Sequence, residues 1–367
     1  MTAPLFIFDI IKVTSGAVPL GLLWAFMAIG IYISYRILDT ADLTAEGAYA
    51  FSACVVGGLV TKEFLTTDFY NNVVLNNNFL MSVFEVLPRP VVATCVAVVA
   101  GALAGTITGL LHTKLKISSL LSGILTMTAL YSVNLRVLSG KANVVLVDND
   151  FKSISVLRPL QEMEIKSGFL RSIFSVYIKE VTSTVNDNTI IKYYLNKNGA
   201  ALILSVVLVI FFILLLWLFF NTEIGYAIRA TGGNPEMARA LGINTDSIKI
   251  LGFAIANSFV ALGGALIAQF DDYAAISVGA GTIVFGLSSV IIGEVLVRQK
   301  KSILIALLSV VLGSVIYRVV IAFSLEMHIK TNDLRLLTSV ILAVTLSTPV
   351  MAEKFGFISK LLKVKQN

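Results

Sequence analysis

Stretches of about twenty apolar residues recur along this chain, and each is long enough to cross the ~30 Å hydrocarbon core of a bilayer as a helix. The stretches are continuously apolar rather than alternating, which favours helices over a membrane barrel. Of the 367 residues, 57% are apolar and 14% are charged, whereas soluble domains carry about 25% charged residues. The sequence therefore predicts an all-α polytopic membrane protein.

The spacing of the apolar stretches predicts about nine membrane segments in a single transmembrane domain that covers residues 1–367. The segments are expected at about 17–36, 39–60, 90–111, 117–138, 200–220, 247–269, 278–297, 302–323 and 334–351. Residues 1–16 are short for a span and carry Asp9 and Lys12, so they are expected to form a helix at the membrane interface. Glycines repeat every fourth residue at Gly101, Gly105 and Gly109, which predicts close contact between that segment and another helix.

Two of these segments, 39–60 and 278–297, mix glycines with apolar residues and are expected to be broken or re-entrant helices. They occupy loosely corresponding places in the two halves of the chain, and such pairs often mark the route of a substrate. The candidate residues of the translocation path are Glu46, Gly47, Gly286, Ser288, Ser289 and Glu294. The predicted topology favours an alternative for the two carboxylates, in which each ends a segment near water.

The distribution of basic residues predicts the topology. Nine segments place the two termini on opposite sides, and the lysine-rich tail argues for a cytoplasmic C-terminus. The loops expected in the cytoplasm are 36–41, 112–116, 221–247 and 298–301. The net charge of +6 is therefore a determinant of topology and not a sign of nucleic-acid binding.

Residues 139–198 contain no apolar run long enough to cross the membrane and are expected to form an extracytoplasmic insertion. Part of this insertion is predicted to be an amphipathic helix, because Phe169, Ile173, Phe174 and Tyr177 follow helical spacing. Either the insertion packs on the membrane surface, or it also docks a substrate-binding protein.

A polar interlude at 225–246 separates two very apolar stretches and contains one short, well-defined helix. Asn234 suits the N-cap, Pro235 the first helical position, and Glu236 the positive end of the helix dipole. Gly242 is expected to end the helix after Leu241.

One face of this short helix is apolar, because Met237, Ala240 and Leu241 are spaced i, i+3 and i+4. Such a rigid, capped helix suits insertion into a partner, although an ordinary helix on the membrane surface is the alternative. Glu236 and Arg239, spaced i and i+3, are expected to brace the helix or to pair with the partner.

The pattern Glu236-x-Ala238-x-x-x-Gly242 resembles the EAA-type cytoplasmic loop of ABC importer permeases. The wider run AIRATGGNPEMARALGIN is similar to the branched-chain amino acid and ribose type of that family, a type II importer-like permease. The run HTKLKISSLLSGILTMTALYSVNLR resembles a subgroup that tends to accompany binding proteins for amino acids. The resemblance covers about residues 17–351.

The resemblance implies that 225–246 is a cytoplasmic coupling loop that docks on a separate ATPase subunit. The implied ATPase-coupling residues are Asn234, Pro235, Glu236, Met237, Ala238, Arg239, Ala240, Leu241 and Gly242. It also implies that two copies of the permease, or two related subunits, enclose one path in a bacterial inner membrane, and a homodimer is expected. An extracytoplasmic binding protein would deliver a small solute, an amino acid or a related compound. The large insertion, and the reduction of an N-terminal span of many relatives to residues 1–16, depart from the family pattern.

The chain lacks the common signatures of catalysis. It has no G-x-x-x-x-G-K-[ST] loop, so any ATP is expected to be used by the partner subunit, and no cofactor or metal is expected in this chain. Cys54 and Cys95 lie in or beside apolar runs and are expected to be small core residues, while His112 and His328 are isolated. The chain is therefore expected to be a transport subunit with lipid contacts, not an enzyme.

Two other functional classes stay open at this point. A secondary transporter or channel without ATP would require paired charges in mid-membrane and repeat symmetry, but no capped cytoplasmic helix. A membrane scaffold would bind its partners through the 139–198 insertion.

Overall fold

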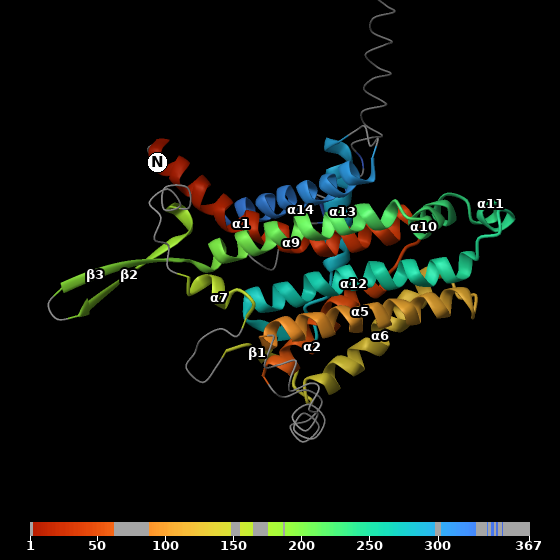
Figure 1. Cartoon of the computed structure of the whole chain (residues 1–367), viewed down its shortest axis with the longest axis horizontal. Helices are drawn as coiled ribbons and strands as arrows, with labels where there is room; N and C mark the ends of the chain where they lie inside the picture. The colour runs from red at the N-terminus through yellow and green to blue at the C-terminus, as the bar shows by residue number, and fades with distance from the viewer. Residues whose placement is uncertain are drawn as a thin grey trace, which may run out of the picture.

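The computed structural model describes residues 3–61, 88–147, 155–163, 175–185, 188–297 and 302–327, together with residues 336, 339, 340, 343 and 347. Its long helices lie roughly side by side (Figure 1). The hairpin of β2 (Ile178–Val185) and β3 (Asn188–Leu195) lies at one end of the bundle. The short helices α10 (Glu223–Gly233) and α11 (Pro235–Ala240) lie at the opposite end.

Within the described residues, six helices are long and apolar enough to cross a membrane by length and composition, which makes the chain a multi-pass membrane protein. They are Val13–Ile37, α5 (Arg89–Thr113), α6 (Ser119–Val137), α9 (Lys197–Phe220), α12 (Thr245–Asp271) and α14 (Ile303–Glu326). Two apolar helices are shorter, α2 (Thr44–Val60) and α13 (Thr282–Leu296). The ninth expected segment, 334–351, lies mostly outside the described residues, so the count of nine stays a prediction.

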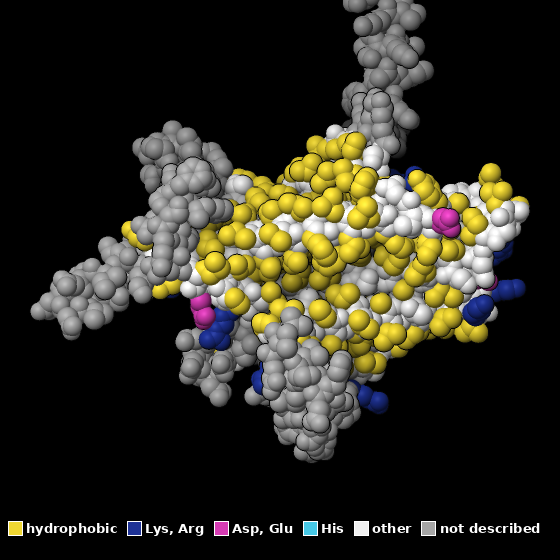
Figure 2. Space-filling model, viewed as in Figure 1, with side chains coloured by type: hydrophobic (Ala, Val, Ile, Leu, Met, Phe, Trp, Pro, Cys, Tyr) yellow, Lys and Arg dark blue, Asp and Glu magenta, His cyan; other side chains and the backbone are white. Residues whose placement is uncertain are grey.

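Apolar side chains cover the middle of the bundle surface, as a lipid environment requires. In Figure 2 they form a broad field across the visible face, and charged side chains lie at its margins. Helix α9 contributes exposed Val207, Phe211, Leu214 and Leu218. Because hydrocarbon is as apolar as these side chains, their exposure in a bilayer carries no penalty.

The first helix is longer than expected. Helix α1 runs without interruption from Ala3 to Tyr32 and continues into a π-helical turn, η1 (Ile33–Ile37). The expectation of an interfacial helix at 1–16, distinct from the first span, is therefore wrong. The single glycine at the expected boundary, Gly16, lowers helix stability by only about 1 kcal/mol, too little to end a helix that is well packed beyond it.

The two glycine-containing segments form unbroken helices, which corrects the expected breaks. Their irregular parts precede them: residues 38–43 come before α2, and residues 276–281 come before α13. The helical glycines serve packing instead. A Cβ on Gly47 would lie 2.9 Å from Met127 Cα of α6, and one on Gly286 would lie 2.2 Å from Ile31 Cδ1 of α1.

The fold is mostly helical rather than all-α, because two short antiparallel sheets interrupt it. Strand β1 (Asn143–Val145) pairs with β4 (Tyr273–Ala275), and Asn143 is opposite Ala275. The β2–β3 hairpin pairs Ile178 with Leu195. Both β1 and the hairpin belong to the 139–198 insertion.

The described part of residues 169–177 does not form the expected amphipathic helix. Residues 169–174 lie outside the described residues, and η3 (Ser175–Tyr177) is a single 3₁₀ turn that leads directly into β2. The β2 sequence IKEVTSTV is rich in β-branched residues, which lose χ1 freedom in a helix and pack well in a strand.

Helix α12 is the centre of the bundle, packed against α1, α2 and α5. The glycine repeat of α5 permits this contact, as predicted. A Cβ on Gly101 would lie 2.2 Å from Ala261 Cβ, and one on Gly105 would lie 2.2 Å from the carbonyl oxygen of Phe253. Helices α5 and α12 therefore approach more closely than larger side chains would allow.

The cysteines and one histidine have structural surroundings. Cys54 is buried as expected, whereas Cys95 is exposed on α5 and so is not a core residue; both are free thiols. His112 Nδ1 lies 2.8 Å from the carbonyl oxygen of Ile117, and its ring packs edge-on against Phe253. His328 lies outside the described residues.

Candidate coupling unit and translocation site

The end of the bundle opposite the hairpin carries the predicted short helix, α11. The backbone N–H groups of Glu236 and Met237 donate to Asn234 Oδ1 at 3.1 and 3.0 Å, which confirms the predicted N-cap. The helix ends at Ala240, one residue earlier than expected. Gly242 follows with φ +84°, and its N–H donates to the carbonyl oxygen of Arg239 at 2.9 Å. A left-handed residue here turns the chain away from the helix axis.

The expected apolar face of α11 points outward. Met237 and Leu241 are 62% and 69% exposed, and Ala240 is exposed beside them. Ala238 is only 1% exposed, so it packs α11 against the rest of the protein and is not available to a partner. The available apolar surface therefore consists of Met237, Ala240 and Leu241.

Arg239 fixes α11 to the first turn of α12. Its Nε donates to Thr245 Oγ1 at 2.6 Å, and its Nη2 donates to Asp246 Oδ1 at 3.1 Å. Arg239 thus braces the loop as expected, and it does so by bonding to α12. Glu236 is exposed.

Helix α10 was not predicted, and it joins α11 to the end of the first helix. Thr222 caps it by accepting a hydrogen bond from the Gly225 N–H at 3.3 Å. Near its other end, a Cβ on Gly232 would lie 1.8 Å from the carbonyl oxygen of Ile37, so only glycine permits this contact. One sequence signal could have predicted the start of α10: Thr222 suits an N-cap, and Glu223 places an acidic residue in the first turn. We call α10 and α11 together the coupling unit.

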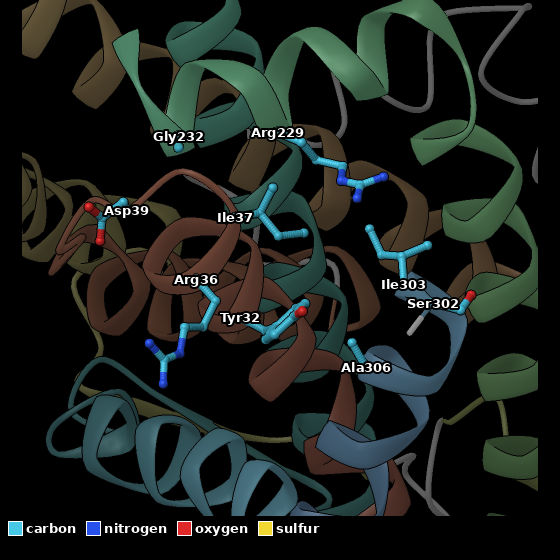
Figure 3. A pocket seen from close by; sticks show the side chains of 10 residues that line it. Tyr32, Arg36, Ile37, Asp39, Arg229, Gly232, Ser302, Ile303 and Ala306 are labelled. Atoms are coloured by element: carbon cyan, nitrogen blue, oxygen red, sulfur yellow. The ribbon is translucent and has the colours of Figure 1, made fainter. Parts of the chain in front are cut away.

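A cavity of about 450 Å³ lies behind the coupling unit (Figure 3). Arg36 of η1, Arg229 of α10 and Ile303 of α14 are among the residues that line it (Figure 3). This cavity separates the unit from the start of α14.

Glu294, one of the expected path residues, pairs with Arg36 at this end of the bundle. Arg36 Nε donates to Glu294 Oε1 at 2.8 Å, and Nη2 donates to Oε2. Arg36 is 48% exposed and Glu294 18% exposed, so the pair is partly solvated, which matches the alternative of a segment end near water.

A second cavity, of about 390 Å³, lies between α2, α6 and residues 276–280, and we call it the Glu46 cavity. It contains the expected path residues Glu46 and Gly47. The other residues that line it are Ala50, Met127, Thr128, Tyr131, Asn134, Ile276, Ser277, Gly279 and Ala280. Met127, Tyr131 and Asn134 were missed because their i, i+4, i+7 spacing equals that of ordinary helix packing.

Glu46 is held by the beginning of α13. Its Oε1 accepts a 3.0 Å hydrogen bond from the N–H of Gly281, the residue that caps α13. Glu294 lies near the other end of the same helix, about 20 Å away at 1.5 Å per residue. The two predicted carboxylates therefore do not share one site.

The other expected path residues lie inside the packed bundle. Ser288 and Ser289 are 0% exposed, and Ser289 Oγ donates to the carbonyl oxygen of Phe285 at 2.9 Å. Gly286 packs on Ile31. None of these three residues lines the Glu46 cavity in this conformation.

The chain matches a family model, described as the branched-chain amino acid transport system permease component, over residues 14–346. It is 34% identical to a tyrosine transport system permease protein of Clostridioides difficile, over 89% of this chain and 88% of that protein. It is also 26% identical to an uncharacterized protein of Rickettsia prowazekii, over 88% of this chain and 92% of that protein.

A shorter match, 32% identical, links 22% of this chain to 23% of the autoinducer 2 import system permease LsrC of Yersinia pseudotuberculosis. No solved structure matches the chain. Permeases of this family are transport subunits that work with an ATPase and a substrate-binding protein. The chain belongs to the branched-chain amino acid permease family and is the membrane permease subunit of an ABC importer.

Proposed function

We propose that the coupling unit docks on a separate ATPase subunit in the cytoplasm and transmits its movement to the permease. The outward exposure of Met237, Ala240 and Leu241 on a capped, braced helix is the observation that carries this proposal. Such side chains are unfavourable in water and suit a pocket on a partner. Residues 225–246 would then be the coupling loop of one transmembrane domain that covers the chain.

The contacts of the coupling unit suggest how a displacement would reach the Glu46 cavity. Arg239 ties α11 to the first turn of α12. Further along α12, Asn257 Nδ2 donates to Asp42 Oδ2 at 2.7 Å, just before α2 and Glu46. Movement of the coupling unit would thus displace α12 and the beginning of α2 together, and so alter access to the cavity.

The transported solute would be an amino acid or a related compound, and tyrosine is the first candidate, since the Clostridioides difficile relative is named as a tyrosine transport system permease protein. A cavity of about 390 Å³ lies within the range of 300–1,000 Å³ found for small-molecule sites. ATP would be used by the partner ATPase, and this chain would hold no cofactor.

The remaining components follow the family pattern. Two copies of this permease would enclose one path in the bacterial cell membrane, with the C-terminus in the cytoplasm. An extracytoplasmic binding protein would dock at the end of the bundle that carries the 139–198 insertion.

The experiment that tests this function is uptake of labelled tyrosine into proteoliposomes that contain the permease, with its ATPase and binding protein added or omitted. Uptake is expected only when ATP and all three components are present. Uptake by the permease alone would identify an ATP-independent transporter instead. The absence of uptake of tyrosine or any other amino acid by the complete system would contradict the assigned substrate class.

A further inference from the structure

The Glu46 cavity carries one carboxylate, and no Lys, Arg or His is among the described residues that line it. Glu46 is half-buried, and its Oε1 accepts a hydrogen bond from the backbone N–H of Gly281 at the beginning of α13. The N-terminus of a helix interacts favourably with a carboxylate placed there. The cavity therefore offers a carboxylate that has no cationic side chain beside it in the described part of the chain.

The carboxylate keeps the capacity to bind a donor. An ionised carboxylate offers about four lone-pair sites, and the backbone N–H of Gly281 uses one of those of Glu46. A ligand that carries a cationic N–H donor would bind to the remaining lone pairs of Glu46, whereas a ligand that carries only a carboxylate would be repelled.

Asn134 supplies a second acceptor at the same cavity. It lines the cavity and is 1% exposed, yet its Oδ1 has no hydrogen-bond partner among the described residues. A buried carbonyl oxygen without a partner is unfavourable. It is satisfied when a ligand donates to it.

The rest of the wall is mainly apolar. Met127 and Tyr131 of α6, Ala50 of α2 and Ile276 line it. Such surfaces suit the aromatic or branched side chain of an amino acid.

We propose that the Glu46 cavity binds the protonated primary amine of the transported solute. The ammonium group donates to the Glu46 carboxylate, and the apolar side chain of the solute rests against Met127 and Tyr131. Asn134 Oδ1 accepts a hydrogen bond from the solute. This inference rests on the proposed function in one respect, which is that the ligand is the transported solute. The chemistry of the cavity selects any primary amine with an apolar group.

The test is protection of a cysteine at the cavity from a maleimide. Ser277 is exposed at the cavity, so the variant Ser277→Cys is accessible to the reagent. The full-length permease in lipid nanodiscs carries Cys95→Ser in addition, because Cys95 is the exposed native thiol in the described part of the chain. Three probes are compared: tyrosine, tyramine, which lacks the carboxylate, and 3-(4-hydroxyphenyl)propanoate, which lacks the amine.

Tyrosine and tyramine are expected to slow labelling by about threefold at concentrations that give two-thirds occupancy, and the amine-free acid is expected to leave the rate unchanged. Glu46→Gln removes the charge at nearly constant volume and should abolish protection by both amines. Asn134→Leu should weaken it. Glu162→Gln is the matched control, since Glu162 is an exposed carboxylate paired with Arg158, away from the cavity.

Equal protection by the amine-free acid would overturn the proposal, because it would show that the amine is not recognised. Absence of protection by every probe, in a permease whose complete transporter takes up tyrosine, would overturn it as well. Protection by amines without uptake of any amino acid would support the cavity and contradict the proposed transport function. The two failures are therefore distinguishable.

Discussion

Asn257, in the middle of α12, donates a 2.7 Å hydrogen bond to the carboxylate of Asp42, which is 5% exposed and precedes α2. Asp42 also accepts from the backbone N–H of Thr44 at 2.9 Å, so its other oxygen caps the beginning of α2. One carboxylate therefore joins the helix that follows the coupling loop to the helix that carries Glu46.

Loss of this hydrogen bond is expected to destabilise the permease. Asn257→Leu removes the donor and leaves a buried carboxyl group short of a partner, which costs about 1–3 kcal/mol. The thermal unfolding midpoint in detergent should fall. Asn221→Leu is the control, because Asn221 donates to Trp217 at an exposed position and its replacement should have little effect. Equal midpoints for the two variants would contradict the assigned importance of Asp42.

Charge on the exposed face of α11 is expected to break the contact with the ATPase. Ala240→Glu and Leu241→Asp alter surface positions, so the permease should fold normally while ATP-driven uptake falls at least about tenfold, the loss that about 1.4 kcal/mol of docking energy produces. Uptake and ATP hydrolysis are measured in proteoliposomes. Leu115→Asp, at a similarly exposed apolar residue outside both the coupling unit and the 139–198 insertion, should transport normally. Normal uptake by Leu241→Asp and Ala240→Glu would refute the docking role.

The conformation of Gly242 is expected to set the direction of the coupling unit. Gly242→Pro cannot adopt φ +84° and removes the N–H that bonds to Arg239, so ATP hydrolysis should continue without uptake. Gly242→Asn should retain coupling, because asparagine tolerates the left-handed region. Uptake by the proline variant at the wild-type rate would show that this turn does not transmit movement.

Gly105 is expected to be required for the close packing of α5 against α12. A Cβ there would lie 2.2 Å from the backbone oxygen of Phe253, which cannot rotate away, so Gly105→Ala should cost about 1–3 kcal/mol. Gly233→Ala is the control, since its Cβ would meet no atom within 4 Å. Thermal unfolding of the two variants in detergent provides the comparison, and a stable Gly105→Ala variant would contradict this packing argument.

Much of the fold could be predicted because it depends on local chemistry. Apolar length identified the long helices, and the residues around α11 predicted its cap and, to within one residue, its end. The glycine repeat of α5 predicted close packing because residues without large side chains let two helices approach each other. Helix α10 was missed because its short sequence carries glycines near both ends, and strand β1 of the insertion depends on pairing with β4, which lies far along the chain.

The candidate site was only partly predictable. Glu46 and Gly47 were identified from their place in a glycine-containing segment, and the structure brings them to one cavity with Asn134. Ser288 and Ser289 lie on the same helix but face the core, and the sequence does not say which way α13 is turned. Glu294 has its partner on η1, and no sequence signal links it to Arg36.

Helix α13 is held near its beginning by Glu46 and near its end by Arg36, side chains from two other elements. Sliding of α13 along its axis would break both contacts, and rotation about its axis would swing the Glu294 side chain away from Arg36. The two glutamates therefore fix both the height and the rotational setting of this helix, and with them the inward orientation of Ser288 and Ser289.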